Sequence, residues 1–121
     1  MRNAAVRCHA GAGDERGSVA AELAVALPAV LIALLLGVGA LSAAATQVSL
    51  QDAAADAARL LGRGEDAARA AGVVRTAVAG ARMTSSRSGD LVCVTTTAEL
   101  GVGRVISIPL RARSCALHGG L

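Results

Sequence analysis

The sequence predicts an α+β fold in which one long N-terminal helix leads into a shorter helix and a small antiparallel β-meander. Three observations predict it: an uncharged apolar run from Leu23 to Ala45, alanine-rich helical spacing as far as Ala81, and an alternating pattern after that residue. We expect four segments in the 121 residues: a leader (1–17), a transmembrane helix (18–45), its continuation outside the membrane (46–62) and a small extracytoplasmic α+β domain (63–121).

Composition argues against several functional classes. The chain contains no Phe, Tyr or Trp, and its net charge of +3 forms no basic block, so neither base stacking nor an electrostatic footprint for nucleic acid is present. We therefore expect no nucleic-acid partner. Without the leader and the membrane helix about 75 residues remain, which is near the size at which a hydrophobic core becomes marginal.

The leader is polar and precedes the apolar run. Its arginines, Arg2, Arg7 and Arg16, predict a cytoplasmic N-terminus, because positive charge next to a spanning segment stays inside. Gly11, Gly13 and Gly17 predict that the leader forms no stable element. Cys8 is interpreted as an incidental thiol of this leader.

The apolar run predicts a membrane-spanning helix. At about 1.5 Å per residue it gives roughly 34 Å of helix, against a hydrocarbon core of about 30 Å. Its only polar side chain is that of Ser42. We therefore expect a single-pass protein of the cytoplasmic membrane with its C-terminal part outside.

Glu22 stands at the entrance to this run, and Gly17-Ser18 precedes it. Taken alone, Glu22 fits a headgroup position near a helix start, where the helix dipole favours an anion. Together, the polar leader, the glycine, the acid at the fifth position after it and the apolar helix resemble the signal of type IV pilin-like proteins. The segment from Gly17 to Pro28 is similar to TadE-like minor pilins of tight-adherence (Flp) pili, in the short form of high-GC Gram-positive bacteria.

This resemblance implies cleavage between Gly17 and Ser18 by an aspartyl prepilin peptidase. It also implies that Glu22 of one subunit pairs with the new N-terminus of the next. The expected partners are the membrane, the peptidase, other Tad pilins and the Tad assembly and secretion machinery. Pilus incorporation would place the protein at the cell surface.

Two alternatives remain. Ser42-Ala43-Ala44-Ala45 offers the small residues of a secretory cleavage site, which would release a small binding protein beginning near Thr46, or the run could serve only as its anchor. The motif is also compatible with a pseudopilin of a secretion system.

Small residues recur at steps of three and four along the run, on one helix face: Ala26, Ala29, Ala33, Gly37, Ala40 and Ala44. This stripe predicts a face for close helix packing in lipid. The alternative is that it reflects only the abundance of alanine. Pro28 predicts a bend in the helix.

Beyond the run, an amphipathic pattern predicts that the helix continues to Leu61 and that Gly62-Arg63-Gly64 ends it. A second helix is expected from Glu65 to about Ala81, with acids in its first turn.

Strands are expected over Met83–Arg87, Leu91–Leu100 and Val105–Leu117, with turns at Ser88-Gly89-Asp90 and Gly101-Val102-Gly103. Pro109 places the last strand at an edge. The inward-facing residues are expected to be Val92, Val94, Thr96, Ala98 and Leu100, and then Ile106, Ile108, Leu110 and Ala112.

Cys93 and Cys115 fall on one face if they oppose each other, and the same register brings apolar residues mostly against apolar ones. A location outside the cytoplasm allows disulfides to persist. We therefore predict a Cys93–Cys115 bridge; a shift of two residues would leave two unpaired thiols.

No enzymatic motif occurs. His9 and His118 lie in the leader and the C-terminal tail, and no CxxC, HExxH, Walker or GxSxG pattern is present. We expect no catalytic residue, metal, cofactor or small-molecule substrate.

Overall fold

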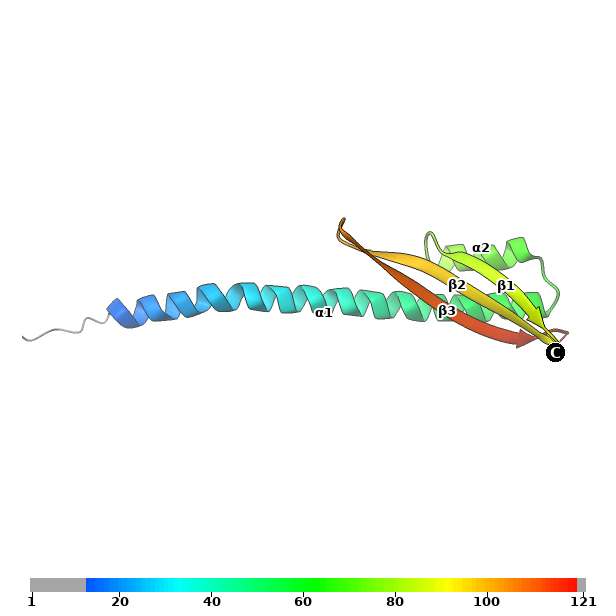
Figure 1. Ribbon diagram of the computed structural model, residues 1–121, viewed down its shortest axis with the longest axis horizontal. Coiled ribbons are helices and arrows are strands. Elements are labelled where there is room, and N and C mark those ends of the chain that lie inside the picture. The colour runs from blue at the N-terminus through cyan, green and yellow to red at the C-terminus, as the bar shows by residue number, and fades with distance from the viewer. Residues whose placement is uncertain (1–12, 120–121) are drawn as a thin grey trace, which may run out of the picture. The chain divides into compact units, whose positions relative to one another are not determined.

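The computed structural model describes residues 13–119, which form two helices followed by a three-stranded antiparallel sheet (Figure 1). The elements are α1 (Gly13–Gly62), α2 (Ala67–Ala77), β1 (Arg82–Ser88), β2 (Leu91–Val102) and β3 (Ile106–Leu117). The predicted α+β class and the order of its elements are confirmed. By its internal contacts the chain divides into two units, Met1–Val38 and Gly39–Leu121.

Helix α1 begins earlier than predicted and ends where predicted. Its first residue is Gly13, so the last part of the expected leader is helical, and the expectation that the leader has no stable element is wrong for residues 13–17. Helical hydrogen bonding from the apolar segment outweighs the low propensity of Gly17. The helix is continuous through Pro28. Cys8 and His9 lie outside the described residues.

Helix α2 is shorter at both ends than its sequence pattern indicated. Asp66 precedes it in an extended conformation, and Glu65 lies in the connection, where its carboxylate pairs with Arg69 at 3.3 Å. Val78 is again extended, and Gly80 follows with a φ of 76°, which favours glycine. This bend redirects the chain into β1.

The strands follow one another in space, in the order β1-β2-β3. The predicted turn before Leu91 is confirmed as Gly89-Asp90, with Gly89 at φ 58°. Cys93 lies opposite Cys115 in the β2–β3 ladder, and Thr96 lies opposite Ala112, as predicted. β3 is an edge strand, which confirms the position expected from Pro109.

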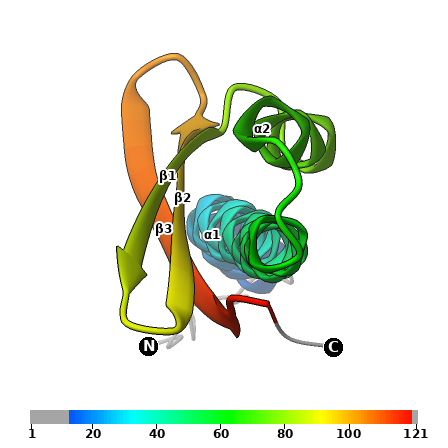
Figure 2. The ribbon, with the colours of Figure 1, turned by 90° about the vertical axis from the view of Figure 1, so that its right-hand side faces the viewer.

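The core lies between the sheet on one side and α2 with the C-terminal part of α1 on the other (Figure 2). Small side chains let these layers approach closely, and the buried apolar residues include Ala53, Ala57, Ala58, Ala70, Val74, Val92 and Val94. Thr96 is fully buried, and its hydroxyl donates to the Leu50 carbonyl oxygen at 3.2 Å. A core without aromatic side chains therefore forms around one satisfied polar group.

The expected inward face of β3 is only partly correct. Ala112 is buried and Leu110 is half-buried, but Ile106 and Ile108 are 59% and 37% exposed. The reason is that a side chain on the inward face is buried only where a helix packs over it, and the core extends along this hairpin only as far as Ala98 and Leu110.

Gly62 packs against the end of β3 more closely than its predicted role as a helix breaker requires. A Cβ at this position would lie 2.6 Å from the carbonyl oxygen of Leu117. The Gly62 carbonyl also accepts a hydrogen bond from the Gly119 N–H at 2.8 Å. The end of α1 and the end of β3 therefore meet backbone to backbone.

We predict opposite effects for alanine at two helical glycines. Gly62→Ala forces the Leu117 backbone to move and should lower the free energy of unfolding by about 1–3 kcal/mol. Gly72→Ala in α2 meets no atom within 4 Å and should raise it by about 0.5–1 kcal/mol. Hydrogen exchange of β3 amides in the detergent-solubilised full chain measures both, and a common sign for the two variants would contradict the prediction.

Candidate functional site

The candidate processing residues lie on α1. Gly17 and Ser18 lie in one turn of the helix, Glu22 lies in the next, and all three are exposed. A Cβ at Gly17 would meet nothing within 4 Å, so the peptide bond after it is sterically open. Within residues 13–119 no side chain forms a hydrogen bond or ion pair with Glu22. Its carboxylate is available to a group from outside this part of the chain.

The apolar segment of α1 exposes its hydrophobic side chains. Its large apolar side chains from Val19 to Leu41 range from 51% exposed at Leu27 to 76% at Val25. The most apolar window has a mean hydropathy of 2.6 and no buried residue. A core helix of a soluble protein would be mostly buried, whereas a signal sequence shares these properties. The segment has the length and composition of a membrane anchor.

The stripe of small residues predicted from the sequence lies on this helix. All six members, from Ala26 to Ala44, are exposed, and a Cβ at Gly37 would meet nothing within 4 Å. No contact inside the described chain therefore requires glycine at this position. Glu22 precedes Ala26 by four residues, so its carboxylate continues the same face.

The two cysteines are joined, which confirms the predicted bridge. Cys93 and Cys115 form a disulfide between directly opposed residues, with a Cα–Cα distance of 4.0 Å. Such a short distance is typical of the narrow, non-hydrogen-bonded pair of an antiparallel ladder. Pro109 lies on β3 an even number of positions from Cys115, so its missing N–H falls on the open edge and removes no ladder bond.

Two glutamines cover part of that edge, a role that the sequence pattern did not reveal. The side-chain amide of Gln47 donates to the Arg111 carbonyl oxygen at 2.7 Å, and that of Gln51 donates to the Arg113 carbonyl oxygen at 3.0 Å. Their spacing of four residues is the only signal that could have indicated a shared partner. These bonds hold β3 alongside α1 and reduce the exposure of an unpaired strand edge.

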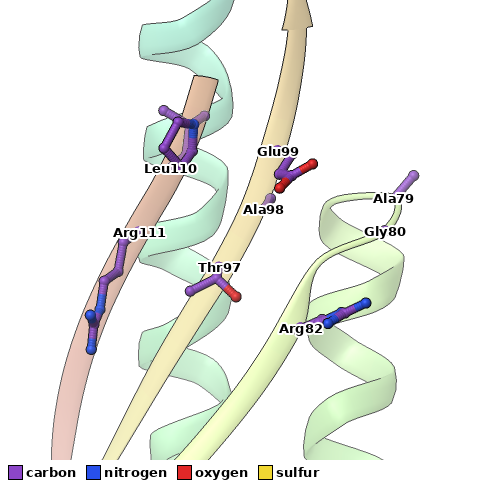
Figure 3. A pocket seen from close by; sticks show the side chains of 9 residues that line it. Ala79, Gly80, Arg82, Thr97, Ala98, Glu99, Leu110 and Arg111 are labelled. Carbon is purple, nitrogen blue, oxygen red and sulfur yellow. The ribbon is translucent and has the colours of Figure 1, made fainter. Parts of the chain in front are cut away.

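A hollow of about 500 Å³ lies between the α2–β1 connection and the ends of β2 and β3 (Figure 3). Its charged lining residues are Arg82, Glu99 and Arg111. Arg82 and Arg111 flank Thr97 on the neighbouring strands, and their side chains extend away from each other (Figure 3), so these charged groups do not converge on one point. Over residues 13–119 no group of three or more His, Cys, Asp or Glu side chains is placed to hold a metal ion. The hollow supports no catalytic assignment.

These features define a class of protein in which one exposed apolar N-terminal helix continues into a small, disulfide-bonded α+β domain. The model of the TadE-like protein family matches residues 17–59, which confirms the resemblance over a segment that begins at Gly17 and ends within α1. Comparison with curated proteins and with solved structures found no match.

Proposed function

We propose that this chain is a minor pilin of the TadE-like kind that takes part in assembling a tight-adherence pilus. The observation that carries the proposal is the family match from residue 17 onward, on a helix whose apolar surface is exposed. An exposed surface of this kind needs lipid before assembly and neighbouring helices after it. No substrate or cofactor enters this function.

The first step is processing by a prepilin peptidase. Hydrolysis between Gly17 and Ser18 removes the leader and leaves a free ammonium group on Ser18. Gly17 supports this site because glycine weakens a helix by about 1 kcal/mol relative to alanine, which eases the local opening that a peptidase needs. The open space around its Cα also gives the enzyme access.

The second step is docking of processed subunits. The Glu22 carboxylate of one subunit pairs with the Ser18 ammonium of the next. An unpaired acid among apolar helices is penalised, and a charge partner offsets the penalty only in the correct register. The exposed small-residue stripe lies on the face of Glu22 and allows a neighbouring helix to approach closely. Pro28 bends the helix along this contact.

The proposed topology follows from the charges that flank the apolar segment. Arg16 lies on its N-terminal side, whereas the first charges after it are Asp52 and Asp56. The N-terminus is therefore in the cytoplasm and the disulfide-bonded domain outside. The oxidised pair Cys93–Cys115 supports this placement, because disulfides persist outside the reducing cytoplasm.

The mature N-terminus tests this function directly. Mass spectrometry of the native protein should find a chain that begins at Ser18. Gly17→Asp should abolish cleavage by a prepilin peptidase and leave the full leader attached, because the peptidase of the resembling family cuts after a glycine. The matched variant Gly13→Ala, on the same helix, should be cleaved normally.

Other outcomes identify the competing functions. A mature chain that begins near Thr46 would indicate secretory cleavage after the Ser42–Ala45 segment and a released binding protein. An uncut chain in cells that contain the peptidase would indicate a plain membrane anchor. Loss of the protein from sheared pili, with normal cleavage, would favour a pseudopilin or an assembly factor over a pilus subunit.

A further inference from the structure

Strand β1 leaves one edge of the sheet open. It pairs with β2 alone, so it forms the edge opposite to β3. All five side chains from Thr84 to Ser88 are exposed. Among residues 13–119 no hydrogen bond reaches this strand except those of its ladder with β2. The unpaired backbone groups of such an edge are a template for another strand.

The Gln51 hydrogen bond shows which backbone groups of β1 are free. Gln51 binds the Arg113 carbonyl oxygen, so the backbone groups of Arg113 point away from β2. The direction of these groups alternates along antiparallel strands, and Thr95, opposite Arg113, therefore bonds to Thr84 on β1. By the same alternation, three residues of β1 direct their N–H and C=O groups to the open side: Met83, Ser85 and Arg87.

The other edge of the sheet is protected in two ways that β1 lacks. On β3, Pro109 has no N–H to donate, and the amides of Gln47 and Gln51 occupy two carbonyl oxygens. The sequence of β1 contains no proline, and within residues 13–119 no side chain binds its backbone. Folded proteins block edges against unwanted pairing, so an edge left open beside a blocked one indicates a place for a further strand.

We propose that β1 of one copy of this protein adds to β1 of a second copy, antiparallel and centred on Ser85. This two-fold pairing aligns all seven residues of the strand, Arg82–Ser88, and the outward-pointing groups exchange about six hydrogen bonds. Ser85 then lies opposite Ser85 of the second copy, and Met83 lies opposite Arg87. The pairing uses β1 alone, so it does not rest on the proposed function.

The charges at the two ends of β1 favour a second copy as the added strand. Arg82 begins the strand, and the exposed Asp90 follows its other end, in the turn to β2. Antiparallel pairing places Arg82 of each copy opposite Ser88 of the other, two positions from Asp90. The positive end of one strand therefore meets the negative end of the other, twice.

The second arginine of the strand selects the register. With the centre at Ser85, Arg87 lies opposite the neutral Met83 of the second copy, and it lines a hollow together with Asp66 of its own chain. With the centre at Arg87, two guanidinium groups would oppose each other, which is unfavourable. The Ser85 register also pairs more residues than any other two-fold register of this strand.

Introduced cysteines test this register in the full-length, detergent-solubilised protein. In a Cys8→Ala background, Ser85→Cys should form a disulfide-linked dimer under mild oxidation, because its Cα atoms lie about 5.5 Å apart in the pairing. Ser88→Cys is the matched control, since it is exposed on the same strand but lies about 20 Å from its own copy. The dimer yield should be several-fold higher for Ser85→Cys. Arg82→Cys mixed with Ser88→Cys should give the mixed dimer.

Hydrogen exchange tests the backbone bonds without a new cysteine. As the unmodified protein is concentrated, the amides of Met83, Ser85 and Arg87 should become several-fold better protected, whereas those of Thr84 and Ser86 already bond to β2 and should not change. Ser85→Pro removes an outward N–H and leaves the β2 ladder intact, so it should abolish this dependence on concentration. Unchanged protection of β2 amides in this variant shows that the domain is folded.

Three results would overturn the pairing. Equal dimer yields from Ser85→Cys and Ser88→Cys would show that copies meet by collision or through the apolar helix. Protection of the Ser85 amide that does not depend on concentration would show that no second copy binds there. Undiminished mixed dimers of Arg82→Cys and Ser88→Cys, after Ser85→Pro is added to both, would show that the edge is not the contact. None of these results changes the mature N-terminus, so the pairing and the proposed function fail separately.

Discussion

Replacing Glu22 by alanine or glutamine should abolish incorporation into the pilus while cleavage after Gly17 continues. Each variant leaves the Ser18 ammonium of a neighbouring subunit without its carboxylate in an apolar contact. Breaking a buried charge pair costs about 3–5 kcal/mol, so association between subunits should weaken by at least about a hundredfold. Glutamine keeps the size of the side chain, which separates the loss of charge from the loss of volume.

Two measurements on the same cells check this result. Mass spectrometry reports the N-terminus, and immunoblotting of sheared pili reports incorporation. Glu15→Gln is the matched control, because Glu15 is exposed on the same helix but would be removed with the leader by the proposed cleavage. Normal amounts of Glu22→Ala protein in sheared pili would show that Glu22 has no pairing role.

Removing the disulfide should have the second large effect. Cys93 and Cys115 are 22 residues apart, and a loop of this length corresponds to about 3 kcal/mol of stabilisation in the chain-entropy model. Small domains have little stability to lose, and this core contains no aromatic side chain. Cys93→Ala with Cys115→Ala should therefore lower protection of β2 and β3 amides from hydrogen exchange by about a hundredfold.

The bridge itself is checked by thiol labelling in a Cys8→Ala background, in which Cys93 and Cys115 are the only cysteines that can take up label. The detergent-solubilised protein should take up label only after reduction. A control with Ser86→Ala, next to Cys93 on β1, should keep full protection, because this exposed hydroxyl has no partner among the described residues. Labelling without reductant, or unchanged protection in the double alanine variant, would contradict the role of the bridge.

Much of the fold and candidate site could be read from local patterns. Spacing and hydropathy within one helix are enough to identify Glu22 and the apolar run that ends at Ala45. The register that joins Cys93 to Cys115 followed from alternation, because a slip of one residue moves every side chain to the other face. The same pattern predicted that Val92, Val94 and Thr96 would be buried, and they are.

Only the tertiary structure shows how far the helices cover the sheet and which residues distant in the sequence come into contact. Alternation placed Ile106 and Ile108 inward, but burial requires a helix over that face, and the core extends along the hairpin only as far as Ala98 and Leu110. The bonds from Gln47 and Gln51 to the edge of β3 join residues more than 60 positions apart, which no local pattern could indicate. Gly62 read as a stop signal until the Leu117 backbone was found against it. The sequence alone determined the apolar helix, the position of its acid and the strand register, because periodicity is local. Packing determined the covered edge of β3, the exposed end of the β2–β3 hairpin and the close contact at Gly62, because each depends on residues distant in the chain.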